Sequence, residues 1–565
     1  MRSLSRGRPA IQRARDATLG LVVVFALLTA PATARAATYT VGPGWPYPTP
    51  SDVPWESLAA GDSVLIHARP APYLDKWVIC RVGTQAAPIV VRGIPDGTGA
   101  LPVIEGANAT TRAALNFWNE ERGVIKIGGA NSPPDAMPAW IVIESLDIRG
   151  ARPENTFTGR NGLTAYGGNA SAIYIEKGQH IVIRGCRLHD CSNGFFCANQ
   201  TSHLLVEGNT IEDNGNVGSI FEHNNYTEAL GIVFQFNHFG LLRSGAGGNN
   251  LKDRSAGTVI RYNWIEGGNR QLDLVESDSN TLINDPTYRQ TFVYGNVLIE
   301  RDADGNSQIA HYGGDGGQQA KYRHGTLYFH HNTVVSRRTG NTTLLRLSSS
   351  GDSADVRNNV VFVTATGNRL ALLDQSGRLV ATKNWLKTGW VASHSGGSVN
   401  LLDNGQVTGS DPGFVDASTD NFELVAGSPC VGQGVGLLPA SLPDHEPVLE
   451  YVRHLASRSR PDDGDVDIGA YEHNPAVGVP IVAETGPRAS ISVTPNPFVG
   501  QCEIRLSGSA RLLQPIDVLD VTGRRIARLS RSEQGRWVWR PDAETPAGLY
   551  FLRAGDRKGR VIYIR

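Results

Sequence analysis

The chain has 565 residues, of which 40% are hydrophobic and 19% are charged. This length exceeds that of one ordinary domain, and this apolar content is too high for a disordered chain, so at least two folded units are expected. Lys and Arg number 53 against 54 Asp and Glu, which gives a formal net charge of -1. No global basic field exists, so nucleic acid and anionic membranes are disfavoured as partners.

The first 36 residues have the pattern of a secretory signal peptide. Five arginines between Arg2 and Arg15 precede the apolar run of residues 19–30, and the segment closes on Ala34-Arg35-Ala36. The run is too short to span a bilayer by itself, and its small closing residues fit cleavage after Ala36. Removing six Arg and one Asp leaves 47 basic and 53 acidic residues, a formal charge of -6. We therefore expect an exported protein, secreted or held at the cell surface, that does not span a membrane.

Six cysteines are too few for a disulfide scaffold in a chain of this length. Cys191 and Cys197 are close enough in sequence for a local bridge, but their spacing fits no zinc motif. The cysteines therefore give no prediction of a metal centre.

From about residue 140 to 390 one unit repeats, a short β-branched strand followed by an Asn and a second apolar strand. Successive Asn residues are 28, 26, 33, 36, 27 and 25 positions apart, so the core of the unit is constant while its loops vary. The Asn residues of the repeat are Asn209, Asn237, Asn263, Asn296, Asn332, Asn359 and Asn384, with Cys186 in the same place one unit earlier. Such a unit cannot bury its apolar side alone, whereas stacked units share one continuous core.

The repeated Asn is expected in a turn between two strands, where its side chain bonds backbone groups and stacks on the Asn of the next unit. Gly-rich turns, alternating apolar residues and little helical pattern predict an all-β fold, a right-handed parallel β-helix. Over residues 37–475 the sequence resembles the pectate-lyase-like superfamily of secreted β-helix proteins.

Both flanks of the repeat region fit this resemblance. Residues 37–73 resemble the opening of such proteins, where a short strand and an amphipathic segment cover the first coil. Residues 411–473 resemble the closing segment of many bacterial β-helix proteins, and we expect caps of this kind because an open end would expose the core.

Beyond a linker at residues 476–489, residues 490–565 change to short strands. Thr494 to Phe498, Asp520 to Arg524 and Ala547 to Arg553 resemble, in that order, motifs of the immunoglobulin-like domain related to the hook-capping protein and to type IX sorting domains. The resemblance implies a small β-sandwich that engages secretion or surface-anchoring machinery.

Chemistry is expected where outward positions of the β-helix carry charge. If Leu251 and Leu272 point inward on successive coils, Lys252 and Asp273 point outward, one above the other, because side chains alternate along a strand. Counting back from each turn Asn brings Ala310 or His311, and then Arg346, to the same stripe. Glu222 falls near it one coil earlier. Trp264 belongs to an aromatic group on these coils and is a candidate for stacking on sugar rings.

The resemblance to polysaccharide lyases of this fold implies roles for these residues. Such enzymes use a Lys or Arg to remove the proton alpha to a uronate carboxylate while another cation or calcium neutralises that carboxylate. The implied roles are Lys252 as base and Arg254 or Arg270 as neutraliser, with His311 and Tyr312 as candidates for the acid. Asp273, Glu276 and Asp278 are candidate calcium ligands, or orient Lys252.

The expected activity is therefore β-elimination on an acidic, uronate-containing polysaccharide. Arg323-His324-Gly325 follows two coils on, in a different strand context from the Arg-His-Gly of related lyases. A non-catalytic adhesin or glycan-binding protein is the first alternative, favoured if the charged stripe is satisfied internally. A glycoside hydrolase or uronate epimerase is the second, although neither the clustered acid pairs of the hydrolases nor the Asp-Pro-His-Asp of the epimerases occurs.

Overall fold

The computed structural model describes residues 36–473, except 303, 397 and 462, and parts of 491–563. Gaps in the second range lie at 495, 497, 507–514, 521–523, 531–536 and 555–556. Residues 1–35 of the predicted signal peptide and the whole predicted linker, residues 476–489, lie outside the described residues. Within the described ranges, no helix has the length and hydropathy that a bilayer crossing requires.

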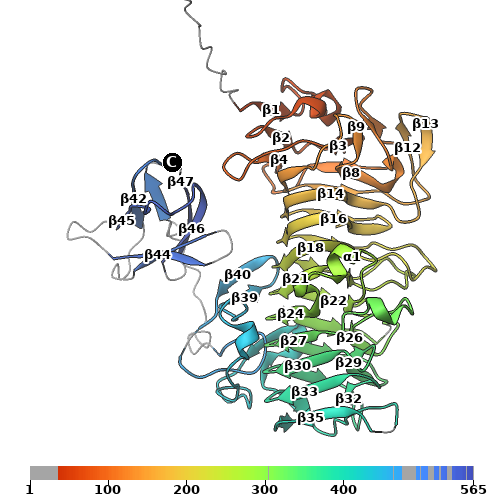
Figure 1. Ribbon diagram of the computed structural model, residues 1–565, viewed down its shortest axis with the longest axis vertical. Coiled ribbons are helices and arrows are strands. Elements are labelled where there is room, and N and C mark those ends of the chain that lie inside the picture. The colour runs from red at the N-terminus through yellow and green to blue at the C-terminus, as the bar shows by residue number, and fades with distance from the viewer. Residues whose placement is uncertain are drawn as a thin grey trace, which may run out of the picture. The chain divides into compact units, whose positions relative to one another are not determined.

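Residues 38–409 form the predicted right-handed parallel β-helix, seen as stacked arrows in Figure 1. Two sheets run along it, and their neighbouring strands pair parallel and in register with few exceptions. The longer sheet contains β1 (Thr38–Val41), β2 (Ser63–His67), β3 (Asp75–Ile79), β4 (Ile89–Ile94), β6 (Thr110–Thr111), β8 (Gly123–Ile127), β10 (Ala139–Glu144), β12 (Thr156–Gly159), β13 (Gly162–Ala165), β14 (Ser171–Arg184), β16 (Asn193–Glu207), β18 (Asn225–Gln235), β20 (Leu251–Asp253), β21 (Ala256–Arg261), β23 (Leu272–Leu274), β24 (Gln290–Tyr294), β26 (Gln308–Tyr312), β27 (Thr326–His330), β29 (Thr342–Leu347), β30 (Ser353–Arg357), β32 (Leu370–Leu373), β33 (Arg378–Thr382) and β35 (Asn400–Asp403). The shorter sheet contains β5 (Val103–Glu105), β11 (Asp147–Arg149), β15 (Arg187–His189), β17 (Thr210–Glu212), β19 (His238–Phe239), β22 (Trp264–Glu266), β25 (Val297–Glu300), β28 (Thr333–Ser336), β31 (Val360–Val363), β34 (Trp385–Lys387) and β36 (Val407–Gly409).

Each coil between residues 251 and 387 contributes three strands. Thus β20, β21 and β22 pair with β23, β24 and β25 of the next coil, which pair in turn with β26, β27 and β28. Earlier in the chain, β14, β16 and β18 each run through the first two positions of a coil as one long strand. Inward side chains stack into one apolar core, which Ile183, Val206, Phe234, Ile260 and Val293 illustrate with no more than 2% exposure.

The predicted asparagine stack is confirmed. Asn209, Asn237, Asn263, Asn296, Asn332, Asn359 and Asn384 are each completely buried. Each donates through Nδ2 to Oδ1 of the next, at 2.8 to 3.0 Å, and the series ends on Gln406. The residue before each Asn turns the chain with a positive φ, as in Tyr262 at 54° and Gly295 at 65°. The turn between the second and third strands is therefore the same on the seven coils that carry these Asn residues.

The segment predicted to close the end of the β-helix instead runs along its side. Residues 411–473, called the strap below, contain the hairpin of β39 (Leu449–Val452) and β40 (Ala456–Ser459), which Figure 1 shows beside the stack. Phe422 and Tyr451 of the strap pack on Trp264, and Leu424 lies in one apolar cluster with Trp385. Outward aromatic residues on the shorter sheet explain this position, because the strap removes them from water.

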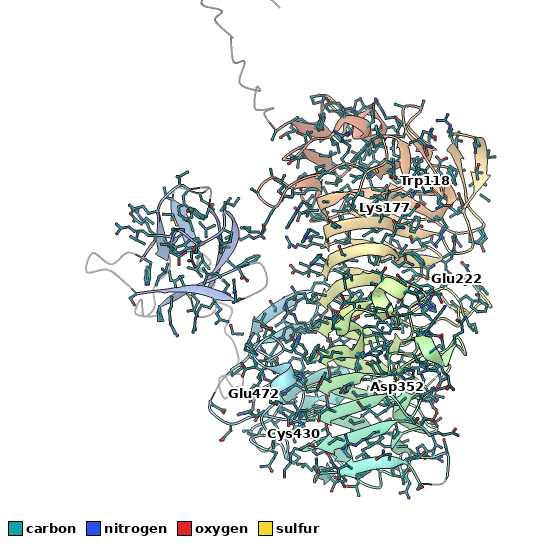
Figure 2. The ribbon with its side chains drawn as sticks, in the orientation of Figure 1. Trp118, Lys177, Glu222, Asp352, Cys430 and Glu472 are labelled. Atoms are coloured by element: carbon teal, nitrogen blue, oxygen red, sulfur yellow. The ribbon has the colours of Figure 1, made fainter. Side chains whose placement is uncertain are left out.

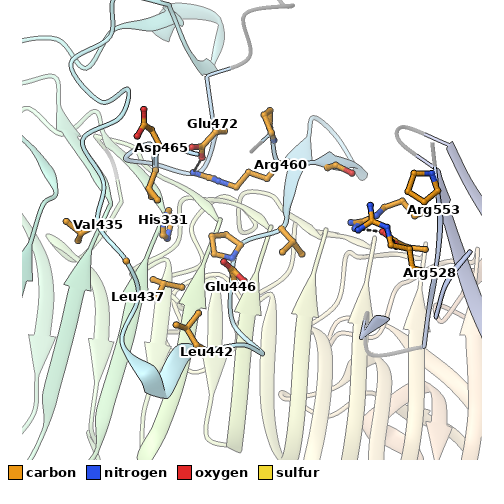
Figure 3. A pocket seen from close by; sticks show the side chains of 18 residues that line it. His331, Val435, Leu437, Leu442, Glu446, Arg460, Asp465, Glu472, Arg528 and Arg553 are labelled. Atoms are coloured by element: carbon orange, nitrogen blue, oxygen red, sulfur yellow. Dashed lines mark hydrogen bonds and ion pairs between the residues drawn. The ribbon is translucent and has the colours of Figure 1, made fainter. Parts of the chain in front are cut away.

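Polar contacts also fix the strap. The Asn358 amide pairs with both backbone groups of Val435, at 2.7 and 3.0 Å. Arg460 and Glu472 form a buried ion pair at 2.5 Å, and Figure 3 shows their side chains directed at each other. The strap is thus an integral part of the folded β-helix.

The C-terminal residues form two antiparallel sheets around their own core. One contains β41 (Ile491–Thr494), β42 (Cys502–Leu506) and β45 (Trp537–Trp539), and the other contains β43 (Ile516–Leu519), β44 (Arg525–Leu529), β46 (Gly548–Ala554) and β47 (Arg557–Tyr563). Trp537, Trp539, Val518 and Leu552 lie in the shared core. This is the small β-sandwich that the sequence predicts, and its role in sorting or anchoring remains a prediction.

All six cysteines are buried as free thiols. The local bridge between Cys191 and Cys197 therefore does not form. Both side chains belong to the apolar core instead, and each is at most 1% exposed.

Candidate functional site on the outer face

The predicted charged stripe is confirmed by the strand register. Lys252 lies opposite Asp273, Asp273 opposite His311, and His311 opposite Arg346, on β20, β23, β26 and β29. Of the two residues that the sequence left open, Ala310 points into the core and His311 lies on the stripe. Stacked strands place such side chains about 4.8 Å apart. Tyr226 on β18 precedes Lys252 in the same register, and these five residues are called the charged stripe below.

Asp273 is the centre of the stripe and is only 1% exposed. One carboxylate oxygen accepts from His311 Nδ1 at 2.9 Å, and the other lies 3.0 Å from Lys252 Nζ and accepts from Asn249 at 2.8 Å. Burial by itself would raise the pKa of Asp273, but the His311 hydrogen bond and the Lys252 charge outweigh it and lower that pKa. Asp273 is therefore ionised and held by three neighbours.

Lys252 is a fixed cation in this arrangement. Its Nζ lies 3.0 Å from Asp273 and 2.9 Å from Asp315, an exposed residue of the loop that follows β26. Burial opposes the charged form, but the two carboxylates raise the pKa of Lys252 above its usual value. A general base needs a lowered pKa, so the geometry opposes the predicted role of Lys252 as base and fits charge neutralisation.

The predicted arginines surround the stripe. Arg254 donates to the Tyr226 hydroxyl at 3.3 Å and pairs with Asp278 at 2.9 Å. Arg270 donates to Gln308 at 2.8 Å and lies 4.0 Å from Asp273. Burial lowers the pKa of Arg270, the Asp273 carboxylate opposes this shift, and the charge of Arg346 lowers the pKa further. Arg346 itself is exposed, and no ion pair to it is found within the described residues.

Two predicted site residues lie elsewhere. Tyr312 is adjacent to His311 on β26, so it points to the opposite side of the strand and is completely buried in the core. It cannot reach a substrate on the outer face, and its predicted role as acid is wrong. Trp264 is outward on β22 but only 2% exposed, because the strap covers it with Phe422 and Tyr451. Its predicted stacking on sugars is therefore also wrong.

Glu222 is not on the stripe, because it belongs to the loop before β18. Figure 2 places it on the edge of the stack that also carries Trp118 and Asp352, opposite the strap residues Cys430 and Glu472. Its Oε2 is buried without a hydrogen-bond partner among the described residues. Contact with substrate through Glu222 remains a prediction.

The carboxylates predicted to bind calcium do not fit a calcium site. Asp273 is held by cationic and amide donors, Asp278 pairs with Arg254 and Lys321, and Glu276 accepts from the backbone amides of Asp315 and Gly316 at 2.8 and 2.6 Å. Calcium needs six to eight oxygen ligands, and these oxygens are already occupied by donors. Across the described residues, the three-ligand cluster that could hold a metal is instead His238, Glu266 and His454.

The sequence did not single out the aromatic residues that continue the stripe. Tyr174 on β14 lies opposite Phe196 on β16, and Phe196 lies opposite Tyr226. Their ring centroids are 5.6 and 5.2 Å apart, and Arg122 covers the first two rings at 4.7 and 4.8 Å. Rings of this kind stack on sugars when they are accessible. The alternation of β14 and β16 would have located them once the register was known.

His223 and Ser348 are further polar residues of the site that the sequence did not reveal. The Asn249 backbone amide donates to His223 Nδ1 at 2.9 Å, so Nδ1 is the acceptor and Nε2 carries the hydrogen. Burial lowers the pKa of His223 to about 3 and keeps the ring neutral. Ser348 Oγ lies 2.8 Å from His311 Nε2. Neither residue belongs to a motif that could be recognised from spacing.

Comparisons with known proteins agree with the fold. Residues 108–287 match the family model described as a right handed beta helix region. A comparison with curated proteins gives no match. The solved structures that are similar include an alginate lyase from Paenibacillus sp. str. FPU-7, at 10% identity and a TM-score of 0.36, covering 66% of this chain and 99% of that one.

Two further structures are similar over most of the chain. Pectate lyase Pel9A has 12% identity and a TM-score of 0.39 and covers 78% of this chain and 97% of its own. XylC in complex with xylose has 9% identity and a TM-score of 0.36 and covers 67% and 87%. At these identities and TM-scores, the likenesses carry no argument about the activity of this chain.

Proposed function

We propose that the charged stripe binds an acidic polysaccharide along the outer face of the β-helix and cleaves it by β-elimination. The observation that carries the proposal is the stacking of Tyr226, Lys252 and Arg346 on one face, with Arg254 and Arg270 beside them. Several cations on one face suit a polymer that carries carboxylates. The partly exposed ring of Phe196 extends the same face toward sugar rings, whereas Tyr174 lies buried beneath Arg122.

Elimination needs a neutralised carboxylate and a group that moves one proton. In the proposed reaction, Lys252 and Arg254 neutralise the uronate carboxylate, so that negative charge can develop at the adjacent carbon. Tyr226, as phenolate, accepts the proton from that carbon. A carbon–carbon double bond forms, the bond to the glycosidic oxygen breaks, and the Tyr226 phenol returns the proton to this leaving oxygen. Tyr226 thus takes the role first assigned to Lys252.

One observation favours a second function, the binding of a glycan without cleavage. Lys252, Asp273 and Asp315 satisfy one another as ion pairs at 2.9 and 3.0 Å. A stripe whose charges are paired internally can serve as a rigid recognition surface and needs no chemistry. Cleavage and binding are separated by whether product forms, not by affinity.

The test is ultraviolet absorbance of the unsaturated uronate after mixing the protein with pectate, alginate, hyaluronan or chondroitin. We expect absorbance to rise with one polymer and to be lost in Tyr226→Phe and Lys252→Met. Arg184→Ala is the matched control, because Arg184 belongs to a separate ladder in which it pairs with Glu207 at 3.1 Å. Binding of one polymer with no absorbance change would contradict elimination and support the recognition surface. A chelator is expected to have no effect, since the predicted calcium ligands are otherwise engaged.

Export through the N-terminal segment and attachment or sorting through the C-terminal sandwich are also proposed, and both rest on the sequence. Mass spectrometry of the exported protein tests the first of these. We expect a mature N-terminus at Ala37, and an N-terminus at Met1 would contradict cleavage.

A further inference from the structure

Asp273, His311 and Ser348 form a chain of hydrogen bonds on three successive coils. Asp273 Oδ1 lies 2.9 Å from His311 Nδ1, and His311 Nε2 lies 2.8 Å from Ser348 Oγ. Each atom is the one that an acid, a histidine and a nucleophilic serine present to one another in acyl transfer. Ser348 directly follows β29, and its side chain is partly exposed, whereas the two residues behind it are buried.

The surroundings of Asp273 fix which atoms donate and which accept in this series of hydrogen bonds. Lys252 and Asn249 hold the other carboxylate oxygen, so Asp273 stays ionised and can only accept from His311. The hydrogen of a neutral His311 therefore lies on Nδ1, and the lone pair of Nε2 faces the Ser348 hydroxyl. The Tyr312 carbonyl, at 3.2 Å from Oγ, is a longer alternative acceptor for the same hydroxyl hydrogen.

Positive groups also lie beside Ser348. The Gly314 backbone amide donates to Ser348 Oγ at 2.9 Å, and Arg346 is two residues earlier on the same side of the strand. The Gly314 amide stabilises the negative charge that develops on Oγ as its proton leaves, and Arg346 adds positive charge to the same face. An outer-face hydroxyl with an adjacent base and adjacent donors has the parts that ester cleavage requires.

We propose that Ser348, His311 and Asp273 hydrolyse an ester, and that the natural substrate is an O-acyl group on a sugar bound along the charged stripe. Ser348 Oγ attacks the ester carbonyl carbon while its proton moves to His311 Nε2. The bond to the sugar oxygen breaks, and that oxygen takes the proton from His311. Water then attacks the acyl-serine, giving its proton to His311 and releasing the carboxylic acid, and Ser348 regains its hydrogen. This activity goes beyond the proposed elimination and does not depend on it.

A covalent probe tests the nucleophile in the full chain. We expect a fluorophosphonate to label Ser348, identified by mass spectrometry of its peptide, and para-nitrophenyl acetate to be hydrolysed. Ser348→Ala should lower the hydrolysis rate by at least ~1000-fold. Asp273→Asn should lower it by a similar factor, because His311 then loses the acceptor that keeps its hydrogen on Nδ1. Ser350→Ala is the matched control, since Ser350 is exposed two residues further on, and it should keep the full rate.

Two results would overturn the proposal. One is absence of label on Ser348 in the folded protein, which needs no variant and so does not depend on how Ser348→Ala folds. The other is a Ser348→Ala protein that hydrolyses the ester as fast as Ser350→Ala. Release of acetate from an O-acetylated polymer extends the test to the natural class of substrate. Because ester cleavage creates no unsaturated uronate, failure of one activity is distinguishable from failure of the other.

Discussion

Replacing Asn296 by Ala tests whether the asparagine stack holds the coils in register. Asn296 lies on the coil of Asp273. Its Oδ1 accepts from the backbone amide of Asn263 at 2.9 Å, and its Nδ2 donates to the backbone carbonyl of Ile260 at 2.9 Å. The substitution strands these two buried backbone groups. A buried polar group without a partner costs about 1–3 kcal/mol, so the free energy of unfolding should fall by about 2–6 kcal/mol.

Urea unfolding followed by tryptophan fluorescence measures this loss. The urea concentration at the midpoint should fall, while the slope of the free energy of unfolding against urea stays constant. Asn161→Ala is the matched control, because Asn161 is exposed in the turn between β12 and β13. The control should change the free energy of unfolding by less than about 0.5 kcal/mol. A loss below about 1 kcal/mol for Asn296→Ala would refute the view that side-chain stacking fixes the turns.

Three further predictions concern buried groups. Burial lowers the pKa of His330 to about 3. At pH 5 the folded protein therefore binds no proton there, whereas the unfolded chain, with a pKa of about 6.5, does. The free energy of unfolding is at its full value above about pH 6.5 and falls by about 2 kcal/mol at pH 5. His330→Phe should reduce the loss of stability at pH 5 by about 2 kcal/mol in urea titrations, while other buried histidines such as His223 keep their own contribution. An unchanged profile would contradict the assignment. Arg323→Met should lower the free energy of unfolding by about 3–5 kcal/mol, because it leaves Asp253 buried without its cation. Lys321→Met, which removes an exposed ion pair with Asp278, should lower it by less than about 1 kcal/mol. Equal losses for the two variants would contradict the role of the buried pair. The six buried thiols should react with a thiol reagent only after unfolding, and rapid labelling of the native protein would disprove their burial.

The repeat was predictable because its signal is local and periodic. Every turn Asn sits between two short apolar strands, and a side-chain period of two assigns each residue to a face once the turn is known. That rule correctly placed Lys252, Asp273 and Arg346 on one stripe although their loops differ in length, and it left Ala310 or His311 open between them, where the structure has His311. The same rule puts Tyr312, the neighbour of His311 in the strand, on the opposite face and in the core, so its predicted role as acid is wrong.

The remaining errors have a non-local cause. Trp264 does point outward, but the strap, residues 411–473, packs over it. No sequence pattern around Trp264 predicts that contact. The roles predicted for Glu276 and Asp278 failed in the same way, because their donors come from loops far along the chain, Gly316 and Lys321. Ser348 was missed since its partner His311 lies 37 residues earlier and only the coil register joins them.

A crystal structure of Tyr226→Phe soaked with oligosaccharides of the preferred polymer would locate the substrate on the β-helix. We expect sugar density along the outer face from Phe196 to Arg346, with a carboxylate against Lys252 and Arg254. Sugar bound elsewhere, such as along the ladder of Arg92, Glu144 and Arg184, would contradict the charged stripe as the functional surface.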